Sequence, residues 1–199
     1  MEQVANQGCL RGSLVQLPEF SHESNGKSFY RFLLEVPRLS GAVDTLPIIV
    51  RDTVLQQVDL SGGEMLTIEG QVRSHNLRTE ERRKLLIFLF ASTITAEDGE
   101  PINQIQLQGN LCREPVYRRT PLGREICDVM LAVPRAFHRA DYIPVILWGS
   151  TARQVAQMHT GQTLQVSGRM QSRIYTKLTP LGAKELTAYE ISALSAEES

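Results

Sequence analysis

The sequence predicts an all-β protein built from two tandem five-stranded barrels, each with a short helix between its third and fourth strands. Three observations support this prediction: an internal repeat, short runs in which apolar and polar residues alternate, and a helical segment at the same place in each repeat. The chain has 199 residues, 42% of them hydrophobic, which suits two small globular domains.

The internal repeat covers most of the chain. Residues 9–60 align with residues 106–157 without gaps, at an offset of 97. After one extra residue the offset becomes 98, and GEMLTIEGQV (63–72) matches GQTLQVSGRM (161–170). Because gaps of one or two residues in loops are enough to align the two copies, we expect two domains of the same fold.

The seam between the copies lies in an acidic, turn-rich segment, AEDGEP (96–101). We therefore expect an N-terminal domain over residues 1–98 and a C-terminal domain over residues 103–195. Near the end of each copy the offset is 100, where Lys84 matches Lys184.

Each copy has the pattern of short strands. In EICDVMLAV, the side chains of Cys127, Val129 and Leu131 fall on one face because direction alternates along a strand. The turn TPLG occurs twice, at 120–123 and 179–182, with proline and glycine where a type I turn favours them, so it predicts two hairpins. The predicted strands of the second copy are 105–112, 125–133, 142–148, 163–175 and 184–194.

A helix is predicted between the third and fourth strands. In STARQVAQMH (150–159), Ala152, Val155 and His159 recur at helical spacing, and Ser150 is a candidate N-cap. Three strands, a short helix and two strands is the order of an OB-fold barrel.

Composition excludes several classes of protein. No window approaches the roughly 18 consecutive apolar residues of a membrane-spanning helix. The start MEQVANQGC has neither the basic beginning nor the apolar core of a signal peptide, so an intracellular protein is expected. The three cysteines form no CxxC pair and no histidine cluster accompanies them, which favours buried free thiols and predicts neither a metal nor a cofactor.

The net charge of −1 hides an asymmetry. Residues 103–199 hold 11 Lys and Arg against 8 Asp and Glu, a net charge of +3, and residues 1–102 hold 10 against 14, a net charge of −4. Attraction for an anion is therefore expected in the second half.

Candidate binding residues cluster in the second copy. Arg169, Arg173 and Tyr175 alternate onto one face of the predicted fourth strand, and Trp148 ends the third. Cations neutralise phosphates and flat rings stack on unpaired bases, so the pattern favours single-stranded nucleic acid. The predicted binding residues are Trp148, Tyr175, Tyr117, Arg118, Arg119, Arg124, Arg169, Arg173 and Lys177.

Structural roles explain the same residues as well. A lone tryptophan often belongs to a core, although Gly149 directly after Trp148 indicates an exposed strand end. Arg169 and Arg173 fit a solvated strand face, and Tyr117 fits the end of a barrel. No catalytic motif occurs, and Glu114, Glu125, Asp128 and Glu190 fall on different predicted strands, so the sequence predicts that the protein is not an enzyme.

Two segments carry a resemblance to a known family. GNLCREPVYRRTPLGREICDVMLAV (109–133) resembles the opening of bacterial single-stranded DNA-binding proteins, and WGSTARQVAQMHTGQTLQVSGRMQSRIY (148–175) is similar to their WGK.AE and GR.Q.R.Y stretches. The chain also resembles primosomal replication protein N, a related single-OB protein. The resemblance implies single-stranded DNA binding without sequence preference in replication, recombination or repair, and a nucleoid-associated protein of the bacterial cytoplasm. It places Trp148 and Tyr175 at stacking positions and the arginines along the DNA path.

The sequence departs from the family in two places. SALSAEES (192–199) is acidic but lacks the Pro-Phe tip through which family members recruit partners. The first copy has Arg51, Leu77 and Phe20 where the second has Trp148, Tyr175 and Tyr117, although QVRSH (71–75) keeps cations, so weak or no binding is expected there. By analogy, a homodimer would supply the family's usual four OB domains. Two alternatives are a protein-interaction or assembly module in a replication or plasmid-transfer complex, and an RNA binder.

Overall fold

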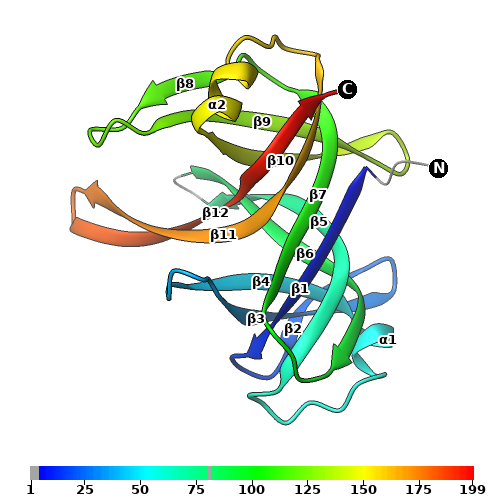
Figure 1. Ribbon diagram of the computed structural model, residues 1–199. Helices are drawn as coiled ribbons and strands as arrows, with labels where there is room; N and C mark the ends of the chain where they lie inside the picture. The colour runs from blue at the N-terminus through cyan, green and yellow to red at the C-terminus, as the bar shows by residue number, and fades with distance from the viewer. Residues whose placement is uncertain (1–4, 80–81) are drawn as a thin grey trace.

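The computed structural model describes residues 5–79 and 82–199, and the side chains of all of these except 77–79, 82 and 83. It contains two sets of six strands and one short helix in the same order (Figure 1). The N-terminal set is β1 (Asn6–Leu14), β2 (Glu19–Ser24), β3 (Lys27–Pro37), β4 (Val43–Arg51), α1 (Asp52–Leu55), β5 (Met65–Thr79) and β6 (Arg82–Ala96). The C-terminal set is β7 (Ile102–Leu111), β8 (Val116–Arg119), β9 (Glu125–Arg135), β10 (Arg139–Trp148), α2 (Gly149–Val155), β11 (Thr163–Thr179) and β12 (Gly182–Glu198).

Each set closes into a barrel of five strands, as predicted. In the C-terminal barrel β7 pairs with both β9 and β11, so the ring runs β7–β9–β10–β12–β11. In the N-terminal barrel β1 closes the equivalent ring with β3 and β5. The sixth strand of each set, β2 or β8, lies outside the ring and forms a hairpin at its edge. The TPLG turn at 120–123 predicted the β8–β9 hairpin, but the predicted strands of the second copy did not include β8.

The helix after the third barrel strand is present in both copies, but it is shorter than the predicted 150–159. Helix α2 ends at Val155, and its N-cap is Trp148 rather than Ser150. Gly149 has φ +57°, a left-handed conformation that glycine adopts without strain, so the chain turns sharply from β10 into the helix. Ala152 and Val155 face the barrel and are buried.

The two barrels share one sheet. Strands β1 and β7 pair antiparallel from Asn6 opposite Leu107 to Arg11 opposite Ile102. The twelve strands therefore form a continuous order that passes from one barrel to the other through β1 and β7, which lie side by side between the barrels (Figure 1). The two first strands are related by the offset of the repeat, so the chain contains an approximate two-fold relation between its halves.

Two buried aspartates repeat this relation across the barrel interface. Asp44 accepts a hydrogen bond from the backbone N–H of Ser172 at 2.8 Å and lies 2.6 Å from Nε of Arg38. Asp141, 97 residues later, accepts one from the N–H of Ser74 at 2.8 Å. Both carboxylates are almost fully buried, and each joins its own barrel to the other.

A bulge in each barrel fixes the register of the last strand. Gly70 pairs with Ala91, and Gly168 with Ala193, each directly after a register shift. A Cβ on Gly168 would lie 2.3 Å from the carbonyl oxygen of Ser192, so the close approach of the strands requires glycine. Counted from the bulge, β6 and β12 are related by an offset of 102.

The predicted offset of 100 at Lys84 and Lys184 is correct when residues are counted from the tips of the two hairpins, but not when they are counted from the bulges. Lys184 lies opposite Lys177 on β11, as Lys84 lies opposite Leu77 on β5, whose side chain is outside the described set. Strands β11 and β12 have 17 residues each and β5 and β6 have 15, so the C-terminal hairpin is two residues longer on each side.

The barrel interiors are filled by alternating Leu, Ile and Val side chains from every barrel strand. All three cysteines are free; Cys127 is buried and Cys9 and Cys112 are half-buried, so the expectation of buried thiols holds fully for one of them. Among the described residues, no helix has the length and apolar character needed to cross a membrane.

The interface aspartates give a stability prediction. We expect Asp141→Ala to lower the free energy of unfolding by about 2–4 kcal/mol, because it leaves Arg73 and Arg135 near an empty, buried position. Urea unfolding followed by circular dichroism measures the change. The matched control is Asp128→Ala, which removes an exposed partner of Arg118 and should change stability by about 0–1 kcal/mol. Equal effects of the two substitutions would contradict the role of Asp141.

Candidate nucleic-acid interface

The predicted binding residues gather mainly on the outer surface of the C-terminal barrel. Residues opposite one another in a ladder point to the same side of the sheet, so the register identifies the members of this surface. The C-terminal face consists of Arg169, Gln171, Arg173, Tyr175 and Lys177 from β11, Lys184, Leu186, Ala188, Glu190 and Ser192 from β12, Ile126 and Asp128 from β9, Arg118 from β8, and Trp148 from β10.

Trp148 lies at the end of β10 with 37% of its surface exposed. Its indole Nε1–H donates a hydrogen bond to Oγ of Ser192 at 3.1 Å, and Ser192 is itself buried. The polar edge of the ring is therefore fixed to β12 while part of the ring remains open to solvent. Trp148 is neither a core residue nor a freely rotating surface residue.

The β11 row continues from this ring. Arg169 lies directly opposite Ser192, the partner of the tryptophan, and Arg173 and Tyr175 follow on the same side. The guanidinium of Arg173 lies 5.7 Å from the centroid of the Tyr175 ring, within range of a cation–π contact. Glu190 accepts a hydrogen bond from Gln171 at 2.8 Å and lies 3.7 Å from Nε of Arg173, which moderates the positive charge of the row.

The hairpin residues divide between two sides of the sheet. Arg118 belongs to the C-terminal face and pairs with Asp128 at 2.9 Å. This hydrogen bond is the main cause of a raised Arg118 pKa. Tyr117 and Arg119 point to the opposite side, because they pair with Cys127 and Glu125. The structure therefore does not bring Tyr117, Arg118 and Arg119 together on one surface.

Glu125 organises the other side of the hairpin. Its carboxylate accepts a hydrogen bond from the Tyr117 hydroxyl at 2.5 Å, lies 3.5 Å from Arg119, and also pairs with Arg153 of α2. The Tyr117 hydroxyl, and after it the charges of Arg153 and Arg119, hold the pKa of Glu125 below its usual range despite partial desolvation. The hydrogen bonds that Arg119 donates to Tyr117 and Glu125 raise the pKa of Arg119 in turn.

The predicted cations differ in how far nearby acids neutralise them. Arg118, Arg119 and Arg173 each have an acidic partner. Among the described side chains, Arg124 and Lys177 have no recorded ion pair, and Arg169 contacts only the amide oxygen of Gln171, at 3.4 Å. Within the same part of the chain, no group of three or more His, Cys, Asp or Glu could hold a metal ion.

The equivalent surface of the N-terminal barrel carries rings that sequence reasoning missed. The repeat places Arg51 at the position of Trp148, and Arg51 does lie there, 3.8 Å from Asp52. Rings come instead from other strands. The N-terminal face consists of His22 from β2, Phe29 and Arg31 from β3, Ile49 and Arg51 from β4, Gln71, Arg73 and His75 from β5, and Lys84, Leu86, Phe88 and Phe90 from β6.

Comparison with known proteins identifies the family. Residues 102–197 match the model of the single-strand binding protein family. "Single-stranded DNA-binding protein 3" of Clostridium acetobutylicum is 35% identical over 104 residues, covering 49% of this chain and 68% of that protein. "Single-stranded DNA-binding protein B" of Bacillus subtilis is 39% identical over 80 residues, covering 37% of this chain and 71% of that protein. The chain belongs to the single-strand binding protein family.

The fold of this family member also has a close counterpart over its whole length. The crystal structure of wild-type single-stranded DNA binding protein from Thermus aquaticus superposes with a TM-score of 0.77, covering 98% of this chain and 92% of that chain at 22% identity. The likeness includes both barrels and confirms the predicted tandem OB-folds. The family model, in contrast, matches the C-terminal barrel, where the motifs that resemble the family lie in the sequence.

The Glu125 cluster gives a prediction about protonation. Because the Tyr117 hydroxyl is the main cause of the lowered pKa, Tyr117→Phe should move the pKa of Glu125 up toward its usual value of about 4.3. Carbon-13 NMR titration of the carboxyl group measures this shift. The pKa is depressed in the folded state, so the carboxylate's contribution to stability exists above the unfolded pKa and is lost as pH falls through the folded pKa. Arg124→Ala, at a residue with no recorded contact to Glu125, should leave the titration unchanged.

Proposed function

We propose that this single-strand binding family member binds single-stranded DNA without sequence preference, through base stacking on Trp148 and Tyr175 and phosphate contacts from Arg169, Arg173 and Lys177. The observation that carries the proposal is the Trp148 ring, which is fixed at its polar edge to Ser192 and open beside a row of cations. We propose that this binding takes part in DNA replication, recombination or repair.

The fixed ring favours binding for an entropic reason. A side chain that is already ordered loses little rotamer freedom when a base stacks on it. Stacking on an aromatic ring is worth about 1–3 kcal/mol per base and tolerates every base, since each has a flat face. The Trp148 platform therefore supports affinity without sequence preference.

The cation row supplies the attraction for phosphates. Arg169 lies opposite Ser192, the residue that accepts the hydrogen bond of Trp148, and Lys177 lies opposite Lys184. Positive charge therefore extends along the β11–β12 hairpin. Each neutralised phosphate releases counterions, and the affinity should fall as salt rises. Arg118, Arg119 and Arg124 lie on the β8–β9 hairpin, but Arg118 and Arg119 point to opposite sides of it. We therefore assign to these three arginines a smaller share of the phosphate contacts than to the β11 row.

The assembly we propose is a homodimer with four barrels. We also propose that the chain divides into domains at residues 1–98 and 103–195, with the interface aspartates keeping them in one arrangement. Light scattering coupled to size-exclusion chromatography tests the dimer: twice the chain mass of 22.3 kDa supports it, and a monomer mass with and without oligonucleotide contradicts it.

Trp148 provides the direct test of binding, because it is the single tryptophan of the chain. Titration with oligo(dT) at low salt should quench its fluorescence, and Trp148→Ala should weaken binding by about 1–3 kcal/mol. The matched control is Phe137→Ala, which removes an exposed ring at the tip of the β9–β10 hairpin, the opposite end of β10, and should leave the affinity unchanged.

The same titration separates the alternatives. An unchanged Trp148 signal at low salt together with stable self-assembly would contradict the proposal and favour a protein-assembly module. Tighter binding of oligo(U) than of oligo(dT) would favour RNA. A linear fall of the logarithm of affinity with the logarithm of salt concentration is expected for the phosphate contacts.

A further inference from the structure

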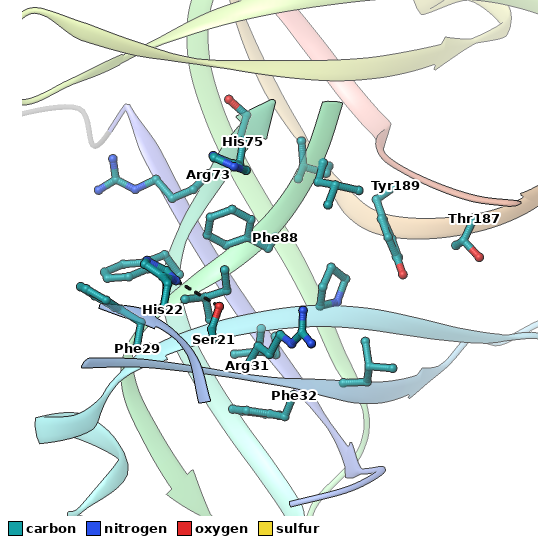
Figure 2. Close-up of a pocket in the computed structure, with 18 of the residues that line it drawn as sticks. Ser21, His22, Phe29, Arg31, Phe32, Arg73, His75, Phe88, Thr187 and Tyr189 are labelled. Carbon is teal, nitrogen blue, oxygen red and sulfur yellow. Dashed lines mark hydrogen bonds between the residues drawn. The ribbon is translucent and has the colours of Figure 1, made fainter. Parts of the chain in front are cut away.

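A groove lies against the N-terminal face. It has a volume of about 1060 Å³. Its walls come from β2 to β6 of the N-terminal barrel, and from β12 and the end of β9 of the C-terminal barrel. Phe88 lies in its middle, with Arg73 and His75 on one side and Tyr189 facing it from β12 (Figure 2). Two barrels therefore build one site, and of its lining the sequence analysis had singled out only the QVRSH segment (71–75).

The groove contains a connected row of rings. His22 is stacked on Phe29, with ring centroids 4.8 Å apart and planes inclined by 13°. Phe29 lies 6.0 Å from Phe90, and the guanidinium of Arg73 lies 5.9 Å from the centroid of Phe90. Phe88 lies two residues before Phe90 on the same strand; it is half-buried and lines the groove.

The bulge register shows how these rings relate to the other barrel. At the offset of 102, Phe90 takes the place of Ser192, the residue that holds Trp148, and Phe88 takes the place of Glu190. The N-terminal face therefore has its ring one strand away from the tryptophan position. It also has a ring where the C-terminal face has a carboxylate that opposes an anion.

Charge in the groove favours an anionic occupant. Its lining includes Arg31, Arg73, Lys84 and Arg135 against two carboxylates, Glu19 and Glu185, among the residues that the structure describes. Arg31 and Glu19 form an exposed pair at 2.8 Å. Arg73 and Arg135 share the single buried carboxylate of Asp141, at 3.3 Å and 3.6 Å, so one positive charge of that cluster remains.

The groove and the C-terminal face lie on opposite sides of the β11–β12 hairpin. Tyr175 points to the C-terminal face, and Thr187 and Tyr189 point to the other side of the hairpin. Thr187 and Tyr189 line the groove together with Glu185 and Leu186. A single strand of nucleic acid that leaves one surface can thus reach the other by crossing one hairpin.

We propose that the N-terminal face is a second binding surface for single-stranded DNA, whose stacking residues are Phe88, Phe90 and Phe29 in place of a ring at Arg51. The proposal rests on the proposed function, since it assigns the same ligand to a second site. It replaces the expectation that this barrel binds weakly because its rings are lost.

A reporter in the groove tests the proposal. In a Trp148→Phe background, Phe88→Trp places the only indole of the chain in the groove. Titration with oligo(dT) long enough to span both barrels should quench it. The matched reporter is Leu39→Trp in the same background, at the fully exposed tip of the β3–β4 hairpin, and its fluorescence should not change.

A second variant measures the contribution of the ring. Phe88→Leu keeps an apolar side chain and removes the aromatic face, and it should weaken binding of the long oligonucleotide about 5- to 100-fold. Circular dichroism and the Trp148 signal verify that the variant is folded. The number of nucleotides covered per chain should also fall.

The outcomes distinguish the two proposals. If Trp148 is quenched but the Phe88→Trp reporter is not, and Phe88→Leu binds normally, the groove proposal is wrong and the C-terminal site stands. If the groove reporter is quenched and Trp148 is not, the groove proposal stands and the C-terminal site is wrong. If neither responds and no binding occurs at low salt, both proposals fail.

Discussion

The pairing of β1 with β7 is the constraint on which the rest of the structure depends. It joins two barrels that are each complete in themselves, and two buried aspartates fix the angle between them by accepting backbone N–H groups of the opposite barrel. A buried carboxylate without such partners would be strongly unfavourable, so the barrels cannot rotate freely about the shared strands. This arrangement brings Tyr189 of one barrel opposite Phe88 of the other and so creates the groove.

The two halves have kept their interiors and changed their outer faces. The bulge glycines, the interface aspartates and the alternating core residues recur at the repeat offsets, because each is fixed by close packing or by burial. On the outer faces, Trp148 over Ser192 corresponds to Arg51 beside Phe90. The ring lies on the third barrel strand of the C-terminal barrel, at Trp148 of β10, and on the last strand of the N-terminal barrel, at Phe90 of β6. Each outer face therefore carries a ring, but at a different place.

Much of the fold could be predicted from the sequence, because alternation along strands and the repeat are local or one-dimensional signals. The site could be predicted only in part. Alternation placed Arg169, Arg173 and Tyr175 on one face. Tyr117 and Arg119 lie on the other side of their hairpin from Arg118 because 116–119 form a strand, β8, which was not among the predicted strands. The offset of 100 inferred at Lys84 is correct only near the hairpin tip, and the strand pairing beyond the bulge places Phe88 at the position of Glu190.

A net charge summed over half of the chain does not give the charge at a particular site. The first half of the chain carries −4, which led us to expect attraction for an anion in the second half. That sum includes groups that are paired with one another, and each such pair contributes no net charge. Asp44 is buried beneath Arg38, and Glu97 pairs with Arg11. Within a Debye length of about 8 Å at physiological salt, a bound phosphate responds to the groups that face it rather than to a sum over a hundred residues. The groove, with more arginine and lysine than carboxylate on its walls, is where that local balance turns positive.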